Sequence, residues 1–269
     1  MIKCKYCIGL FAIVVLLASC GNSYNKLLKS SDHDKKYEAA VAAFEKKDYF
    51  HATQLFENLL VFYRGRQKSE AVLFYYARSL FGMKDYFTAG YQFSNFYKRF
   101  PHSDNAEEAL YMAAYCKYQE SPDWSLDQTM TKEAMKDFQA FIDKFPSSSR
   151  IAEANKLMDE LRNKLIKKDY ETAYLYYKTR NYQSAQVAFR LFLNEYPDSQ
   201  YREQAMYYII IAGYELATNS VESKQKGRYE AMISDYQKYA TLFGDKEKEK
   251  QNQLLDLYNK ARQHLEAIK

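Results

Sequence analysis

The sequence predicts an all-α fold, a solenoid of about five stacked helix pairs. Residues that interrupt helices are scarce, since the 269 residues include only 8 glycines and 4 prolines. Apolar residues recur with the period of a helix, and the same apolar pattern returns several times along the chain. Such recurrence is typical of solenoids, in which each repeat packs on its neighbours.

The repeated pattern is measured from a small residue. A phenylalanine stands four residues later, and a leucine or phenylalanine stands seven residues later. At about 100° per residue these offsets project onto one narrow stripe, so each copy predicts a helix with one apolar face. The four copies are Ala52, Phe56 and Leu59; Ala89, Phe93 and Phe96; Ala134, Phe138 and Phe141; and Ala185, Phe189 and Phe192; Met232, Tyr236 and Tyr239 form a weaker fifth.

The ends of these helices are also marked. In three copies a proline twelve residues after the small residue disfavours helical geometry in the residue before it. A serine two residues after each proline is expected to cap the next helix by accepting a free backbone N–H. Before three copies, Lys-Asp or Arg-Asn followed by tyrosine predicts a polar turn. The prolines are Pro101, Pro146 and Pro197, the serines Ser103, Ser148 and Ser199, and the tyrosines Tyr49, Tyr86 and Tyr182.

A further Lys-Asp-Tyr step at 168–170 lies too close to the next turn to begin a helix pair of its own. We therefore expect Glu171–Lys178 to be the first helix of the fourth pair, fused to a helix over Arg150–Lys167. Repeats one to three are then expected in residues 34–147. Repeats four and five and a terminal helix are expected in residues 148–269.

The small residue, the aromatic residue and the proline fit the second helix of a tetratricopeptide repeat. The copies lie farther apart than the about 34 residues of a regular repeat, so their helices are expected to be elongated. The largest irregularity, residues 119–129, lies between the helices of the third pair and contains the only tryptophan, Trp124. This insert is interpreted either as a partner-contact loop or as a spacer.

The first 19 residues have the layout of a secretory signal. Lys3 and Lys5 precede the apolar run Ile8–Ala18, which is about half the length that a membrane-spanning helix needs. Leu-Ala-Ser before Cys20 resembles the lipobox of bacterial lipoproteins, in which the cysteine is lipidated after cleavage. Residues 20–33 then form a lipidated tether; the alternative is a plain signal peptide with a chance cysteine.

The rest of the composition argues against catalysis. The four histidines are scattered, and the sequence has no glycine-rich phosphate loop and no Gly-x-Ser-x-Gly elbow. We expect no enzyme, no metal and no cofactor. The formal charge of +5 falls to +3 without Lys3 and Lys5, and no basic block indicates nucleic acid. Once Cys20 carries lipid, Cys116 has no disulfide partner and is interpreted as a small buried residue.

The 27 tyrosines are expected mainly to pack helices together. Two clusters, 74–76 and 174–177, contain more aromatic residues than one helix face is expected to bury. Tyrosines on the concave face of a solenoid would suit extended or unfolded peptides. The candidate partner-binding residues are Tyr75, Tyr76, Trp124, Tyr176 and Tyr177.

The lipobox, the repeat number and the chain length together resemble the BamD family, lipoproteins of the outer-membrane β-barrel assembly machinery, in its Bacteroidetes-like branch. Similar stretches are Tyr-Asn-Lys-Leu-Leu-Lys-Ser at 24–30 and Glu-Ser-Pro at 120–122. The resemblance implies a scaffold on the periplasmic face of the outer membrane. It would bind the periplasmic domains of BamA through later repeats and the C-terminal signal of unfolded outer-membrane proteins through early repeats. Ala188 stands where the family leads us to expect arginine.

Two other classes compete with this reading. Another periplasmic tetratricopeptide adaptor, which coordinates cell-wall or envelope complexes, is the main alternative. A carbohydrate-binding lipoprotein of the SusD type would need about twice the length. Gly21 after Cys20, with no acidic cluster behind it, favours the periplasmic face over inner-membrane retention or surface export.

Overall fold

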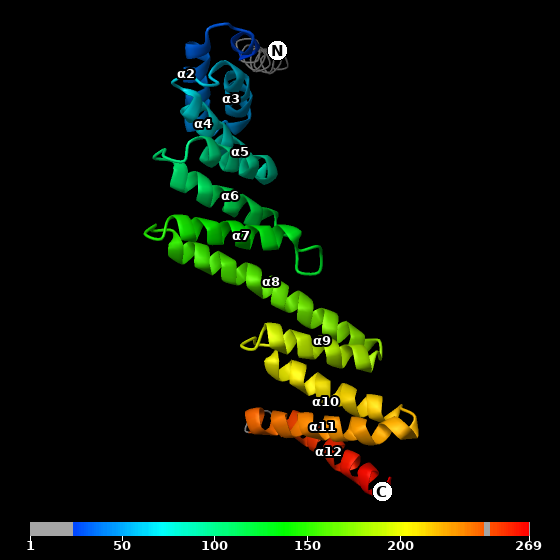
Figure 1. The fold of residues 1–269 in the computed structure, drawn as a ribbon. Coiled ribbons are helices and arrows are strands. Elements are labelled where there is room, and N and C mark those ends of the chain that lie inside the picture. Colours follow the sequence, from blue (N-terminus) through cyan, green and yellow to red (C-terminus); the bar gives the residue numbers. More distant parts are fainter. Residues whose placement is uncertain (1–23, 245–247, 269) are drawn as a thin grey trace, which may run out of the picture. The chain divides into compact units, whose positions relative to one another are not determined.

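A computed structural model describes residues 24–244 and 248–268 (Figure 1). The predicted signal segment and Cys20 lie outside the described residues, so their assignment stays a prediction. Within those ranges every labelled element is an α-helix, which confirms the all-α prediction. The helices are α2 (His33–Glu45), α3 (Tyr49–Phe62), α4 (Ser69–Gly82), α5 (Tyr86–Arg99), α6 (Ala106–Glu120), α7 (Thr129–Lys144), α8 (Ile151–Lys178), α9 (Tyr182–Glu195), α10 (Arg202–Thr218), α11 (Glu222–Phe243) and α12 (Lys248–Ala267).

The helices follow one another as tetratricopeptide-like pairs, from α2/α3 to α10/α11, and α12 is the terminal helix. The fused helix of the fourth pair is confirmed, because α8 continues without a break through the Lys-Asp-Tyr step at 168–170.

The chain forms two compact units. Unit 1 comprises the residues up to Pro122 together with Asp127–Leu161, and unit 2 comprises Asp123–Leu126 and the residues from Arg162 onward. The boundary differs from the expected division at 147/148, which followed the proline joint. The reason is that α8 residues up to Leu161 pack in one apolar cluster with α6 and α7, whereas Ile166 and Tyr170 pack in another with α9 and α10.

The predicted stripe forms the core of both units. Every stripe residue of the four strong copies is 3% exposed or less. In the weaker copy Met232 and Tyr239 are buried, and Tyr236 packs against them from a partly buried position. In unit 1 each helix from α2 to α7 packs on the next, as in a solenoid.

The polar turns before α3, α5 and α9 share one backbone conformation. Lys47, Lys84 and Arg180 adopt the left-handed conformation, with φ near 60°. The next residue is the N-cap in each turn, and in two of them its side chain caps the helix: the Asp48 and Asp85 carboxylates accept backbone N–H groups three residues on. A left-handed non-glycine residue is strained by about 1 kcal/mol, so the caps and the packing of the following helix must offset that cost.

The serines after the prolines differ from the expectation. The N-cap of α6 is Asn105, and Ser103 lies two residues earlier, where its Oγ accepts the Asn105 N–H at 3.0 Å. Ser148 and Ser199 do the same for the residue two positions on, each at 3.1 Å. These serines therefore close the turn before a helix rather than cap its first turn. The Ser148 hydroxyl also donates to Glu107 at 2.6 Å, and Ser103 binds Glu70 in the same way.

Unit 2 contains a partly buried ion pair between helices. Arg190 of α9 donates from Nη1 to Asp235 Oδ1 at 3.2 Å and from Nη2 to Oδ2 at 2.5 Å. The Asp235 side chain is 8% exposed, so this forked contact supplies the hydrogen bonds that a carboxylate on α11 needs when it is removed from water. Ala188, two residues before Arg190, is partly buried and packs against the apolar cluster of α8, α9 and α10.

Candidate functional site

The residues that sequence analysis considered for chemistry are the acidic, histidine and cysteine side chains. In residues 24–244 and 248–268 no group of three or more His, Cys, Asp or Glu side chains could hold a metal ion. Burial raises the pKa of the Cys116 thiol to about 12, with Glu120 and Asp85 adding to the effect, so the thiol is protonated near neutral pH. Cys116 is buried, as expected.

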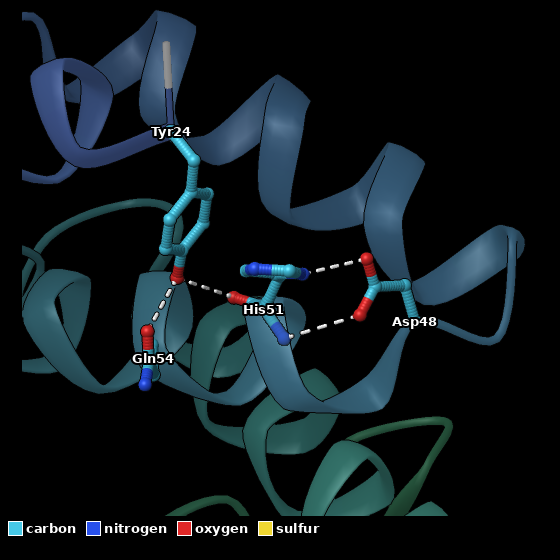
Figure 2. A network of polar contacts seen from close by, with 4 residues as sticks. All are labelled: Tyr24, Asp48, His51 and Gln54. Carbon is cyan, nitrogen blue, oxygen red and sulfur yellow. Dashed lines mark hydrogen bonds and ion pairs between the residues drawn. The ribbon is translucent and has the colours of Figure 1, made fainter. Parts of the chain in front are cut away.

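The short segment before α2 is held against the first helix pair. Residues 24–28 form a helical turn, and the Tyr24 hydroxyl donates to Gln54 Oε1 at 2.8 Å and to the His51 carbonyl at 3.3 Å. Figure 2 shows the Tyr24 ring pointing toward α3, with the His51 side chain between Tyr24 and Asp48. The His51 ring lies edge-on to Tyr24 with centroids 4.1 Å apart, and its Nδ1 is 2.7 Å from Asp48 Oδ2.

A buried lysine holds the same segment from the other side. Lys36 of α2 is 2% exposed, and its Nζ donates to the Leu28 carbonyl at 2.9 Å and to Asn58 Oδ1 at 2.6 Å. Burial lowers the pKa of Lys36. Two independent groups of contacts, one at Tyr24 and one at Leu28, therefore dock residues 24–28 on α2 and α3.

The predicted tyrosines of α4 lie mostly inside unit 1. Phe74 and Tyr76 are 5% and 7% exposed, and Tyr75 stacks on Phe56 with ring centroids 5.6 Å apart. One helix face alone does not bury this cluster, because α4 packs against α3, α5 and α2 and buries more than one face. Partner binding by Tyr75 and Tyr76 stays a prediction, with little of Tyr76 open to solvent.

The remaining predicted residues belong to unit 2. Tyr176 is 40% exposed, whereas Tyr177 packs against Tyr208 with centroids 4.8 Å apart. The Trp124 ring is half-buried, and Lys167 Nζ lies 4.7 Å from its centroid. Among these tyrosines Tyr176 therefore presents the most ring surface, and a role in binding stays a prediction for all of them.

Packing explains much of the tyrosine content of unit 2. Tyr170, Tyr174 and Tyr177 follow one face of α8, with successive ring centroids 6.3 Å and 6.1 Å apart. Tyr208 of α10 joins this row to Phe189, whose ring is nearly parallel to it at 5.8 Å. Burial raises the pKa of Tyr177, as expected for a phenol in an aromatic cluster.

Sequence reasoning missed a groove on unit 1. A cavity of about 340 Å³ opens where α5, α6 and α7 meet. Phe87 and Tyr91, which line it, are 72% and 68% exposed. Both lie two residues from Ala89 and therefore off the buried stripe, and this spacing is the sequence signal that could have predicted their exposure. The acidic residues of the groove come from α6 and α7, and only the fold brings them near α5.

Comparison with known proteins identifies the family. The family described as YfiO, outer membrane lipoprotein, matches residues 29–228. The chain belongs to this family. No curated protein sequence matches it. Among solved structures, it is similar to one described as the P58(IPK) TPR domain, with 14% identity and a TM-score of 0.41 over 90% of this chain and 68% of that chain.

The family is one of outer-membrane lipoproteins. The tetratricopeptide-like fold is shown by the order of the helices themselves. None of the helices in the described ranges is long and apolar enough to cross a membrane.

Proposed function

We propose that this YfiO-family protein is a lipid-anchored periplasmic scaffold in the assembly of outer-membrane β-barrel proteins, as the BamD resemblance implies. It binds the periplasmic domains of BamA and unfolded outer-membrane proteins and catalyses no reaction. The observation that carries the proposal is the family match over residues 29–228, most of the chain that follows the predicted tether. A tetratricopeptide-like fold supports it, because stacked helix pairs offer extended surfaces for other proteins.

The docked N-terminal segment gives the anchor a short reach. Cys20, the proposed lipid-bearing residue, is separated from Tyr24 by residues 21–23. At most about 3.6 Å per residue, Cys20 lies within about 15 Å of the Tyr24 Cα. The first helix pair is thereby kept next to the membrane surface, on its periplasmic face. Confinement at a membrane raises the effective concentration of weakly binding partners.

Co-purification tests the choice of partners. The full chain, solubilised from membranes in detergent, is expected to recover BamA at a stoichiometric level. Recovery of cell-wall enzymes in place of BamA would establish the alternative adaptor role. Depletion gives a second measurement: the level of folded outer-membrane barrels should fall before growth stops, and unchanged barrel levels in growing cells would contradict the assembly role.

Replacement of Cys20 tests the anchor. A Cys20→Ser protein is expected to fold with the same helical content and to fractionate as a soluble periplasmic protein. A fully functional soluble form would show that the short tether is dispensable.

A further inference from the structure

The groove on unit 1 has a glycine at the closest approach of two of its helices. A Cβ on Gly90 of α5 would lie 3.0 Å from the Cβ of Cys116 on α6. Gly90 thus lets α5 approach α6 closely, and the groove opens beside this contact toward α7. The groove is therefore built by packing inside unit 1 and does not depend on mobile loops.

One wall is apolar and open to water. Phe87 and Tyr91 are four residues apart on α5, so their rings lie on the same side of the helix. Met130 lines the groove from α7. The neighbouring Tyr86 is different, because its ring packs on Phe81 with centroids 5.4 Å apart. Two adjacent aromatic rings that are more than two-thirds exposed mark a surface that a partner can cover.

The opposite wall is acidic. Lys117 Nζ lies 2.9 Å from Glu133 Oε2 and 2.9 Å from Asp137 Oδ2, so one ammonium group faces two carboxylates. Glu120 also lines the groove and forms no ion pair within the described part of the chain. Three carboxylates and one ammonium group leave a formal charge of −2 beside the exposed rings.

We propose that this groove binds a protein segment in which an aromatic or large aliphatic side chain stands next to lysine or arginine. The apolar side chain packs between Phe87, Tyr91 and Met130, and the cation reaches Glu120 and Oε1 of Glu133. A cation over the Tyr91 ring would add a favourable contact. Anionic lipids and nucleic acids are repelled by the same charge, as is a free C-terminal carboxylate. The occupant is therefore an internal, basic and aromatic segment.

Peptides of matched length test this chemistry. Short labelled peptides with amidated C-termini carry Lys-Phe-Lys, Glu-Phe-Glu or Lys-Ala-Lys at their centre. Fluorescence anisotropy measures their binding to the full chain in detergent, with micelles alone as the blank. The Lys-Phe-Lys peptide is expected to bind about tenfold more tightly than either of the others. Equal binding of the three peptides, or no binding of Lys-Phe-Lys, overturns the proposal.

Variants locate the binding. Phe87→Ala with Tyr91→Ala is expected to weaken Lys-Phe-Lys binding by about tenfold. Val187→Ala with Leu191→Ala is the matched control, because these exposed apolar side chains have the same spacing on α9. Glu120→Lys should weaken binding most at low salt, whereas Glu38→Lys on α2 should not. An equal loss in the controls overturns the location. The proposal needs neither BamA nor the lipid anchor, so its failure leaves the proposed function standing.

Discussion

The turns after Pro146 and Pro197, one in each unit, give a quantitative prediction about stability. Ser148 donates from Oγ to Glu107 Oε1 at 2.6 Å and accepts the Arg150 N–H at 3.1 Å. Ser199 accepts the Tyr201 N–H at the same distance, but its hydroxyl has no side-chain partner in the described residues. The two serines therefore form a matched pair that differs by one hydrogen bond to a carboxylate.

The expected loss of stability in each serine variant follows from that difference. A hydrogen bond between neutral groups contributes about 1 kcal/mol, and one to a charged group contributes about 1.5–3 kcal/mol. Glu107 and Ser148 are both partly exposed, so the lower end applies to their contact. Ser148→Ala should lower the free energy of unfolding by about 2 kcal/mol and Ser199→Ala by about 1 kcal/mol. A double-mutant cycle of Ser148→Ala with Glu107→Gln should show a coupling of about 1 kcal/mol.

Urea denaturation followed by far-UV circular dichroism gives the stabilities. Hydrogen exchange assigns each loss to the correct helices, since repeat proteins open in parts: the amides of α6 and α7 report on Ser148, and those of α9 and α10 report on Ser199. Equal costs for the two serines, or a coupling below about 0.3 kcal/mol, would refute the claim that the carboxylate contact stabilises the turn.

Three further predictions concern the N-terminal repeats. Lys47→Gly should raise the free energy of unfolding by about 0.5 kcal/mol, because glycine adopts the φ of 60° without strain; a lower urea midpoint would contradict this. Hydrogen bonds from Lys68 and Tyr63 lower the pKa of Asp34, so their contribution is present above the unfolded pKa of about 3.9 and is lost as the pH falls below it. Asp34→Asn should therefore flatten the dependence of the urea midpoint on pH between pH 5 and pH 2, and superimposable profiles would exclude this contribution. Tyr24→Phe removes the bond to Gln54 and should speed tryptic cleavage after Lys26 by about fivefold, with the exposed Tyr91→Phe as control; unchanged cleavage would show that this bond does not hold the segment.

Local patterns in the sequence were enough to predict the helices and their buried faces. The spacing of Ala134, Phe138 and Phe141 determines which side of α7 is apolar, and Pro146 determines where that helix ends. Neither depends on knowledge of the partner helix. The continuity of α8 was predictable for a related reason, because the distance to the next turn leaves room for one helix only.

Local sequence patterns could not predict the contacts that join separate helices. The burial of Tyr76 follows from the placement of α4 among its neighbours, which the sequence of α4 does not encode by itself. The contact of Ser148 with Glu107 joins the turn after α7 to the first turn of α6. The acidic groove likewise needs Glu120 and Glu133 from α6 and α7 beside Phe87 of α5. Side chains far apart in the chain become one surface only after packing.

Lys36 can contribute to two different properties: the stability of the first helix pair and the docking of residues 24–28. Its buried ammonium group is hydrogen-bonded to Leu28 and Asn58 and has no carboxylate partner among its described contacts. Replacing buried charged groups by apolar side chains of similar size is often neutral or stabilising, so Lys36→Met should leave the free energy of unfolding within about 1 kcal/mol of its original value.

The same change leaves the Leu28 carbonyl without its donor, so residues 24–28 should detach more often. Tryptic cleavage after Lys29 should therefore accelerate although global stability is retained. Slower or unchanged cleavage would show that Lys36 serves the helix pair alone. Accelerated cleavage at unchanged stability would mean that the buried lysine serves to position residues 24–28 and, under the proposed function, to keep the reach of the anchor short.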